Sequence, residues 1–574
     1  MGKRRRVSKP SLSALGVALV FSILMAAGAA TAPQRAATSP VAGAPTNEWL
    51  TWGYDQERTL WNQAETALNK DNVARLSLKW KTQIPTPARE EVLATLTTPL
   101  VAKVDTPQGL ATRVFVVGSD DTVFAVDAAN GAISWQRRFP NTMTPSVAPD
   151  YRCPSTQNAT PVIDKETGTI YVSTSDGKLR GLSLVNGDDR MPPIDFTNVF
   201  ARNWSLNLID GVIYSPTARG CLGIPSHLTS VDLKDPARRK REFFTSPGGP
   251  SGAWGRGGIV RGPKYIYVQT ADGPYDPGAG KFGNSVLALT FEDLRLADSY
   301  TPENWEYLNA KDLDLSSANA VAFPFQGRTI VASVGKESVV SLLDGENLGG
   351  KNHQTPLYTS PRWGNDEAML HDRGVWGAMA TWQDAQGRRY LAMSMLGPVG
   401  KSTPPFKYTN GPANDGSLMT FEVRQDTATS KPMLVPLWTS RELHAPDVPV
   451  VANGVVYAFQ SGKDSTETRA LGAARGAGGG RGTGGAVGAN AARGAGAGSG
   501  AGRGASAGRG AGAAPASASI GTTAILYAFD ADTGKQLFST ELDSFNHFTN
   551  PVVADGVVYA VTWDGKLYAF GLEK

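Results

Sequence analysis

Cysteine and histidine are scarce in this chain of 574 residues, which has two cysteines, Cys153 and Cys221, and five histidines. Two cysteines cannot form a four-cysteine zinc site, and neither stands in a CxxCH haem-attachment motif. The histidines show no HExxH or other metal-ligand spacing. These absences exclude the common zinc centres and a covalently attached c-type haem.

Long apolar runs are also missing, apart from LSALGVALVFSILMAAGAA at residues 12–30. Five basic residues precede this run, and Ala30-Thr31-Ala32 after it fits the small-x-small cleavage rule. The pattern predicts a secretory signal peptide over residues 1–32, then a flexible segment over 33–47, in a periplasmic or secreted protein. An uncleaved membrane anchor is the alternative.

The net charge of +4 comes from segments outside the expected folded part. Residues 469–519 are rich in Gly, Ala, Arg and Ser, contain six arginines and no acidic residue, and have too few bulky apolar residues to fold. Without these arginines and the five basic residues near the N-terminus, 45 basic residues face 52 acidic ones, a net charge of −7. The basic balance is therefore no evidence for nucleic-acid binding. We expect 469–519 to be a disordered loop insertion; a nucleic-acid-binding arm is the alternative.

Glycine, proline and aromatic residues are abundant, and one phrase recurs. VFAVDAANGAISW at residues 123–135 and LYAFDADTGKQLF at 526–538 share the pattern apolar-x-Ala-apolar-Asp-Ala-x-x-Gly-x-x-x-aromatic. An apolar strand that ends in Asp, turns through a glycine and continues into an aromatic residue is typical of a β-hairpin. Weaker copies of the phrase occur at 179–191 and 339–351.

The repeats divide the chain into seven units of four short strands and an eighth unit, 547–574, with only three. Four-stranded repeats of about 40–50 residues predict an all-β fold, an eight-bladed β-propeller over residues 48–574. We expect LSLKWKTQI at 76–84 to supply the missing strand, which would remove a free sheet edge. A β-solenoid or a pair of β-sandwiches is the alternative. The seven full units cover 92–139, 155–196, 203–245, 255–300, 317–359, 374–440 and 445–541.

Three stretches together resemble the quinoprotein alcohol dehydrogenases, eight-bladed propellers that bind pyrroloquinoline quinone. The recurring phrase resembles their tryptophan-docking motif, and WLTWGYDQERTLWNQAETALNKDNVARLSLKW at 49–80 resembles their opening segment. TPENWEYLNAKDLDLSSANAVAF, from residue 301, and GKESVVSLLD, from residue 335, resemble their central blades. Propellers related to this family also include scaffolds without catalytic activity.

The resemblance implies a planar quinone on the propeller axis and a Ca²⁺ ion held by oxygen ligands. Trp254 stands where the family has a tryptophan beneath the quinone, and Lys336 where it has a cation that contacts the quinone oxygens. Asp314 is the candidate catalytic base, and Asp312, two residues earlier on a segment expected to be extended, is a candidate calcium ligand. Asp272 falls near an amide ligand of calcium in the family.

The chain departs from the family at two places. SPTARGCLGI at 215–224 contains no acidic residue where a calcium-binding glutamate is expected. A vicinal cysteine pair is expected in DYRCPSTQN, but only Cys153 is present, and Asn158 is the nearest polar residue to a missing arginine. As a hypothesis, Cys153 and Cys221 form one disulfide between successive blades that replaces the vicinal bridge.

Two functions follow from these observations. The first is a periplasmic dehydrogenase that oxidises an alcohol, polyol or sugar with pyrroloquinoline quinone and Ca²⁺, and passes electrons to a separate c-type cytochrome. The second is a non-catalytic propeller that binds proteins or components of the cell envelope. If the tryptophan, the three aspartates and the lysine named above share one pocket, the enzyme is favoured; if they are scattered, the scaffold is.

Overall fold

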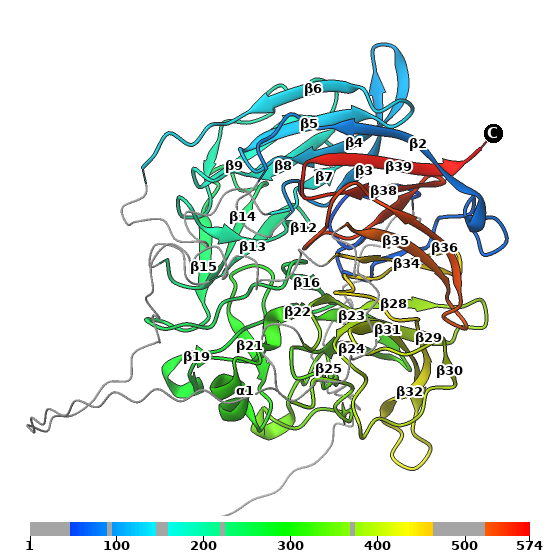
Figure 1. Ribbon diagram of the computed structural model, residues 1–574. Coiled ribbons are helices and arrows are strands. Elements are labelled where there is room, and N and C mark those ends of the chain that lie inside the picture. The colour runs from blue at the N-terminus through cyan, green and yellow to red at the C-terminus, as the bar shows by residue number, and fades with distance from the viewer. Residues whose placement is uncertain are drawn as a thin grey trace, which may run out of the picture. The chain divides into compact units, whose positions relative to one another are not determined.

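Eight sheets of four or five strands, in which two short edge strands pair parallel and the others antiparallel, make up the fold of the described residues (Figure 1). The computed structural model describes residues 46–88, 94–144, 159–218, 224–367, 373–462 and 523–573, which lie in the unit Ala44–Lys574. The predicted signal peptide, the predicted insertion, both cysteines and Asn158 lie outside the described residues.

The first four sheets follow one another along the chain as blades 1 to 4 of a propeller. Their strands are β3 (Leu100–Thr106), β4 (Gly109–Val117), β5 (Thr122–Asp127) and β6 (Ile133–Arg138) in blade 1; β7 (Val162–Asp164), β8 (Thr169–Ser173), β9 (Lys178–Ser183) and β10 (Ile194–Asp195) in blade 2; β11 (Arg202–Asn203), β12 (Asn207–Ile209), β13 (Val212–Ala218), β14 (His227–Asp232) and β15 (Lys240–Phe244) in blade 3; and β16 (Val260–Arg261), β17 (Ile266–Gln269), β20 (Val286–Leu289) and β21 (Leu296–Tyr300) in blade 4.

Blades 5 to 8 continue the same order, and the last two blades also take strands from the N-terminal part of the chain. Their strands are β23 (Val321–Phe325), β24 (Arg328–Ser333), β25 (Ser341–Asp344) and β26 (Tyr358–Thr359) in blade 5; β28 (Ala380–Gln383), β29 (Arg389–Leu396), β30 (Tyr408–Thr409), β31 (Gly416–Gln425) and β32 (Pro432–Thr439) in blade 6; β33 (Val450–Ala452), β34 (Val455–Gln460), β35 (Ile525–Asp530), β36 (Gln536–Glu541) and β1 (Trp61–Asn62) in blade 7; and β37 (Val552–Ala554), β38 (Val557–Val561), β39 (Lys566–Leu572) and β2 (Leu76–Gln83) in blade 8.

Strand β2 closes the ring of blades, as the sequence predicted. It pairs antiparallel with β39 along its whole length, from Leu76 opposite Leu572 to Gln83 opposite Lys566, and Figure 1 shows the two strands side by side. The predicted eight-bladed propeller is therefore confirmed. The short elements outside the blades are the pair β18 (Tyr275–Asp276) and β19 (Lys281–Phe282), the pair β22 (Ala318–Asn319) and β27 (Gly377–Ala378), and helix α1 (Trp305–Lys311).

Burial explains why the strands of one blade differ in composition. Each residue of the first strands β33 and β37 is buried, because these strands have neighbours on both faces. The outermost strands β6 and β15 instead alternate between exposed and partly buried residues. The residues that the structure describes include no helix long and apolar enough to cross a membrane.

The recurring phrase forms the hairpin that its sequence predicted, and its aromatic residue packs against the next blade. Gly131 and Gly534 adopt φ of +77° and +71° in the two hairpin turns. The Trp135 ring lies against Gly187 of blade 2, where a Cβ atom would come within 2.7 Å of the indole. The Trp135 indole N–H also donates to the Leu184 carbonyl at 3.1 Å. In the second copy, Gly534 instead packs against the ring of Trp438 of blade 6, so each copy joins two neighbouring blades.

Residues 49–62, which we call the axial segment, contact the inner part of all eight blades in turn. The contacts follow chain order, so that about two residues of the segment serve each blade. They are the hydrogen bonds of Trp49 with Val101, Leu50 with Ile163, Thr51 with Leu206, Gln56 with Arg261, Glu57 with Ala322, Thr59 with Thr381, Leu60 with Val451 and Asn62 with Val553. The opening stretch of the sequence thus ties the innermost strands together.

Candidate functional site

The residues that the sequence analysis selected lie in loops on one face of the propeller, which we call the loop face. In an antiparallel blade, the loop after the second strand and the connection to the next blade open on the same side. Asp272 and Lys336 follow the second strands of blades 4 and 5, β17 and β24. Trp254 lies in the connection from blade 3 to blade 4, and Asp312 and Asp314 lie in that from blade 4 to blade 5.

Asp272, Asp312 and Asp314 form an acidic cluster in which one carboxylate oxygen of each lies within 4.8 Å of the other two. Asp312 ends helix α1 with φ of +54°, and Asp314 precedes the 3-10 turn Leu315–Ser317. The segment is therefore a tight turn and not the extended chain that we expected. The turn still brings both carboxylates to the same place, and hard oxygen ligands in this number suit a divalent cation.

Lys336 joins the acidic cluster from blade 5. Its Nζ donates to Asp314 Oδ2 at 2.6 Å and lies 3.5 Å from Asp312 Oδ1. The side chain is 4% exposed, so this ammonium group depends on the carboxylates for its partners. One ammonium group faces three carboxylates, which leaves the described cluster with an excess of negative charge when all three are ionised.

The surroundings separate the pKa values of the three carboxyl groups. Burial, together with the charges of Asp314 and Asp312, raises the pKa of Asp272 to about 8. Burial also raises the pKa of Asp312. Burial acts in the same direction on Asp314, but the Lys336 ammonium outweighs it and holds the pKa of Asp314 below its usual value. Asp314 is thus held as a carboxylate at neutral pH.

Two asparagines hold the acidic cluster in place. Asn284 Nδ2 donates to Asp272 Oδ1 at 3.1 Å and to Asn309 Oδ1 at 2.8 Å. The backbone N–H of Asp272 donates to Asp314 Oδ1 at 3.0 Å. Asn309 lies on α1 and exchanges two hydrogen bonds with the backbone of Gly273. These bonds connect the blade 4 loop to the turn that carries Asp312 and Asp314.

An aromatic cluster lies directly beside the acidic cluster. The Trp254 and Trp376 rings meet edge-on with centroids 5.5 Å apart, and the Phe548 ring stacks on Trp376 at 6.4 Å. Trp204 meets Phe548 edge-on at 6.2 Å. These four residues come from the connections into blades 3, 4, 6 and 8, so the cluster gathers at the axis. Lys336 Nζ lies 4.9 Å from the Trp376 ring centre and 5.6 Å from that of Trp254.

A buried ion pair supports the aromatic cluster. Arg256 Nη1 lies 2.6 Å from Asp447 Oδ1, and both side chains are buried. The Arg256 guanidinium lies 3.6 Å from the centre of the Phe548 ring, while Asp447 Oδ2 accepts the backbone N–H of Phe548 at 3.0 Å. Gly257 packs so closely on Trp52 of the axial segment that a Cβ atom would come within 2.4 Å of its ring. The loop face therefore rests on the axial segment.

Blade 3 adds buried polar atoms that have no hydrogen-bond partner among the described residues. They include the indole nitrogen of Trp204 and the hydroxyl of Thr217, which lies in strand β13. Atoms of this kind also occur elsewhere in the described residues, so the two atoms of blade 3 count only as candidate hydrogen-bond donors for a ligand. No acidic residue stands at 215–218 or 224, the described part of the stretch where a calcium-binding glutamate was expected.

The structure brings together Trp254, Asp272, Asp312, Asp314 and Lys336, as the enzyme hypothesis required. Asn158 and the proposed pair Cys153–Cys221 lie outside the described residues, so these predictions stay predictions. Sequence reasoning missed several supporting residues, which are Trp204, Trp376, Phe548, Arg256, Asp447, Asn284 and Asn309. One signal was available: Trp254 and Trp376 each precede a glycine shortly before the first strand of a blade.

A family model matches two parts of the chain and leaves out most residues of the site. The model described as outer membrane protein assembly factor BamB matches residues 54–192 and 437–573. These ranges contain blades 1, 7 and 8, blade 2 without its last strand β10, and most of the axial segment. The acidic cluster, Lys336 and the three tryptophans of the aromatic cluster lie between the two matched ranges, whereas Asp447 and Phe548 lie in the second range. No curated protein sequence matches the chain.

Solved structures with a similar fold include three alcohol or methanol dehydrogenases. The quinohemoprotein alcohol dehydrogenase from Comamonas testosteroni is 15% identical, with a TM-score of 0.55 over 92% of this chain and 82% of that one. Alcohol dehydrogenase ADHIIG from Pseudomonas putida HK5 is 13% identical, with the same TM-score, over 92% and 80%. A europium-containing methanol dehydrogenase is 14% identical, again with 0.55, over 92% and 98%. The chain therefore has the eight-bladed propeller fold of quinoprotein alcohol dehydrogenases.

Proposed function

We propose that the protein is a periplasmic quinoprotein dehydrogenase that oxidises an alcohol, polyol or sugar. The observation that carries this proposal is the position of Lys336, whose ammonium group bonds Asp314 and lies over the rings of Trp254 and Trp376. The ammonium group of Lys336 therefore contacts both the carboxylate that would accept a proton and the aromatic surface on which a flat ring system could stack. A scaffold has no physical need for this arrangement.

The residues present fit a planar quinone and a cation. Trp254 and Trp376 offer aromatic surface against which a flat ring system can stack. Lys336 would donate to the quinone oxygens, and the unpaired Trp204 N–H and Thr217 hydroxyl are further candidate donors. Asp272 and Asp312 would hold Ca²⁺ or a similar hard cation, with Asp314 as a third oxygen ligand.

When bound, the quinone accepts the hydride of the substrate and the cation polarises the quinone carbonyl. The protein's own residues supply orientation and proton transfer. Asp314 is ionised and buried, so it is suited to accept the hydroxyl proton of an alcohol. Lys336 keeps that carboxylate in one orientation through the 2.6 Å bond. Because the chain has no CxxCH motif, we infer that a separate c-type cytochrome receives the electrons.

Reconstitution tests the proposal. Purified protein is mixed with pyrroloquinoline quinone and Ca²⁺, quinone binding is followed by absorbance, and dye reduction is measured with a panel of alcohols, polyols and sugars. We expect saturable quinone binding, and dye reduction with at least one substrate class. Absence of quinone binding at high micromolar quinone, with Ca²⁺ or with a lanthanide ion, would overturn the proposal.

A second function is a scaffold that binds proteins of the cell envelope, and the match to the assembly-factor model favours it. That match covers blades 1, 7 and 8 and most of blade 2, and leaves out the acidic cluster. The two functions separate experimentally because a scaffold has no use for Lys336 and Asp314. If the protein binds neither the quinone nor a cation but does bind envelope proteins, the scaffold function is supported and the dehydrogenase function is not.

A further inference from the structure

Arg389, the first residue of strand β29 in blade 6, is a buried cation without a polar partner. The residue is 5% exposed, and it forms no hydrogen bond or ion pair with any residue that the structure describes. The rings of Phe323 and Trp61 lie beside it, with their centres 5.5 Å and 5.9 Å from its Cζ. Aromatic rings attract a cation but do not satisfy its N–H donors as an oxygen does. The hydrogen-bond donors of the Arg389 guanidinium are therefore unused.

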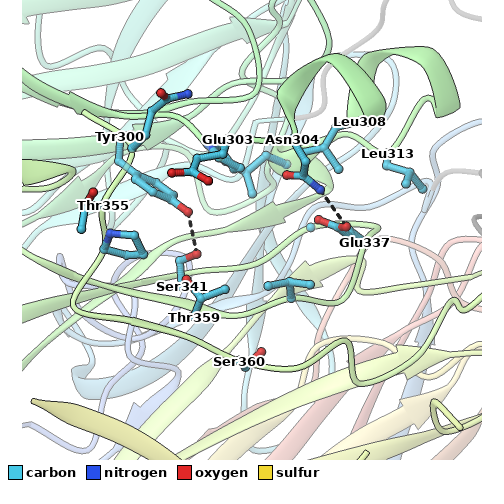
Figure 2. Close-up of a pocket in the computed structure, with 16 residues that line it drawn as sticks. Tyr300, Glu303, Asn304, Leu308, Leu313, Glu337, Ser341, Thr355, Thr359 and Ser360 are labelled. Carbon is cyan, nitrogen blue, oxygen red and sulfur yellow. Dashed lines mark hydrogen bonds between the residues drawn. The ribbon is translucent and has the colours of Figure 1, made fainter. Parts of the chain in front are cut away.

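The other buried aspartates, glutamates, lysines and arginines of the described ranges all have at least one hydrogen bond. Glu337, which is only half-buried, is paired as well. In the pocket that Figure 2 shows, Asn304 donates to Glu337 Oε1 at 2.9 Å, and Arg362 Nη2 lies 2.6 Å from the same atom. Because a buried charge without a partner is costly, a ligand that supplies one is stabilising at Arg389. The paired buried charges are Glu48, Arg58, Glu65, Asp121, Arg256, Asp314, Lys336 and Asp447.

Two further arginines lie in this region, and both have partners. Arg58 donates to the carbonyl oxygen of Leu206 at 2.9 Å. Arg261 Nη1 donates to Gln56 Oε1 at 2.6 Å, and its Nη2 lies 3.4 Å from the exposed carboxylate of Asp210. Among these three arginines, it is the guanidinium in blade 6 that is left to bind a group from outside the described residues.

Asp55 of the axial segment compensates the charge of Arg389 only in part. Burial lowers the pKa of the Arg389 guanidinium to about 10, and the charge of Asp55 acts in the opposite direction. The Asp55 carboxylate is bonded elsewhere, because it accepts the backbone N–H of Thr59 at 2.8 Å and also the hydroxyl of this residue. Burial and the nearby Glu57 raise the pKa of Asp55 to about 7, so this carboxyl group loses its charge as pH falls below 7. Arg389 then lacks a counter-charge.

We propose that Arg389 binds a small monocarboxylate, such as formate or acetate. The planar guanidinium matches a carboxylate through two parallel N–H···O bonds, and one unpaired positive charge suits a monoanion. Nε is buried without a partner, whereas both Nη atoms, also without partners, keep some exposed surface. Since the whole residue is only 5% exposed, the anion that reaches these atoms is small.

This site lies away from the proposed quinone site. Arg389 follows the hairpin that joins β28 to β29, the first and second strands of blade 6. In an antiparallel blade this hairpin opens on the side opposite the loop after the second strand, and therefore opposite the loop face. The proposal goes beyond the dehydrogenase function and does not depend on it.

Saturation-transfer NMR on acetate, together with thermal melts of the full chain at pH 6, tests the proposal. Sodium acetate replaces sodium chloride at constant ionic strength. We expect saturable transfer to the acetate methyl protons and a melting temperature that rises with acetate and then levels off. Acetamide, which has the shape of acetate without its charge, gives neither effect. Inorganic phosphate binds at least about tenfold more weakly than acetate, because it is not planar.

Three variants assign the effect to one guanidinium. Arg389→Met abolishes both acetate signals, and without acetate it melts no lower than the unmodified protein, because an apolar side chain replaces a buried charge without a partner. Arg389→Lys keeps the charge but loses the planar fork, and weakens acetate by about tenfold. The matched control is Arg388→Met, which removes the neighbouring exposed guanidinium that pairs with Asp384 at 2.6 Å and leaves acetate binding within about twofold.

Several results would overturn the proposal. Acetate signals that persist in Arg389→Met place the anion elsewhere, and equal signals from acetamide show that charge plays no part in binding. Tighter binding of phosphate or chloride than of acetate contradicts the monocarboxylate. If Arg389→Met does not fold, Arg389→Lys carries the test, and unchanged acetate affinity in this variant has the same consequence. We expect quinone binding to be unaffected by Arg389→Met, so the two proposals fail separately.

Discussion

The axial segment and the loop face both place charged groups close to the propeller axis, yet they treat charge differently. In the axial segment, Asp55 and Glu57 lie among the cations Arg58, Arg261 and Arg389. On the loop face, three carboxylates share the single ammonium group of Lys336. The two carboxylates of the axial segment therefore have three arginines beside them, one from the segment and one each from blades 4 and 6. The second has an excess of negative charge when its carboxyl groups are ionised, which a bound cation would balance.

The hydrogen bonds distinguish the two regions less sharply than the charges do. Arg58 donates to Thr51 Oγ1 at 2.7 Å and to the Leu206 carbonyl at 2.9 Å, and its side chain is fully buried. The loop face leaves the Trp204 N–H and the Thr217 hydroxyl without partners among the described residues. The axial segment also has two such atoms, Trp49 Nε1 and Arg58 Nε, so the balance of charges separates the two regions more clearly than the unpaired polar atoms do.

The largest effect is expected for catalysis on the loop face. Asp314→Asn removes the carboxylate that accepts the proton and keeps the size of the side chain, so we expect the dye-reduction rate to fall by about 10³-fold. Quinone affinity, measured by absorbance, stays within a few-fold. Asp293→Asn, an exposed acid on the outer side of blade 4, serves as the control and retains full activity. If Asp314→Asn kept more than about a tenth of the rate of the unmodified protein, Asp314 would not be the proton acceptor.

The largest effect on stability is expected in the axial segment. Arg58→Met removes a buried cation that bonds blade 3 and leaves Asp55 and Glu57 with less compensation, which we expect to cost about 3–5 kcal/mol of unfolding free energy. Urea denaturation measures this loss. Arg75→Met, at an exposed position, changes stability by less than about 0.5 kcal/mol. Equal effects of both variants would contradict the role of the axial segment.

The two regions differ in how pH and a cation act on stability. The pKa of Asp272 is about 8 in the folded protein against 3.8 for the free side chain, so the folded state retains a proton that the unfolded chain has lost. Stability contributed by Asp272 is therefore complete below pH 4 and decreases as pH rises toward 8, by up to about 1.4 kcal/mol per pH unit. We expect millimolar Ca²⁺ to restore this stability above pH 8, and Asp272→Asn to make the free energy of unfolding less dependent on pH.

Asp55 of the axial segment serves as the comparison, because no metal ion is expected to bind beside it. Burial and the nearby Glu57 raise the pKa of Asp55 to about 7, so its contribution also decreases as pH rises from 4 toward 7. Asp55→Asn flattens this dependence, but Ca²⁺ does not restore the loss in the unmodified protein, because arginines already occupy the surroundings. Thermal melts at several pH values, with and without Ca²⁺, distinguish the two aspartates. Ca²⁺ rescue that persists in Asp272→Asn would contradict this assignment.

The smallest effects compare two tryptophans. Trp254→Phe on the loop face keeps an aromatic ring at a half-buried position, so we expect a stability change below about 1 kcal/mol and a several-fold loss of quinone affinity. Trp52→Phe in the axial segment leaves a cavity against Gly257 and costs about 2 kcal/mol. Quinone binding in Trp52→Phe stays close to that of the unmodified protein. A larger destabilisation by Trp254→Phe would reverse the comparison.

Much of the fold was predictable because a propeller repeats a local pattern. The hairpin phrase, its turn glycines and the missing strand of the last unit are short-range features, and all three led to the observed blades. The path of the axial segment was not predictable. Its hydrogen bonds join residues up to about 490 positions apart, as Asn62 and Val553 show, and no periodic pattern marks them.

The site was predictable only where single residues matched a known motif. Trp254, Asp272, Asp312, Asp314 and Lys336 could be named from local sequence, although the turn at Asp312 was expected to be extended. The ion pair of Arg256 with Asp447 spans 191 positions, so local sequence holds no record of it.

The sequence by itself determined the number of blades, the closing strand and the kinds of residue available at the axis, because these depend on repeats and local turns. Only the tertiary structure decided which of those residues meet. Lys336 contacts Asp314 and two tryptophans because successive blades turn their loops to the same face around one axis. That convergence is a property of the closed ring, and it gives the charges of the site their distances and their pKa values.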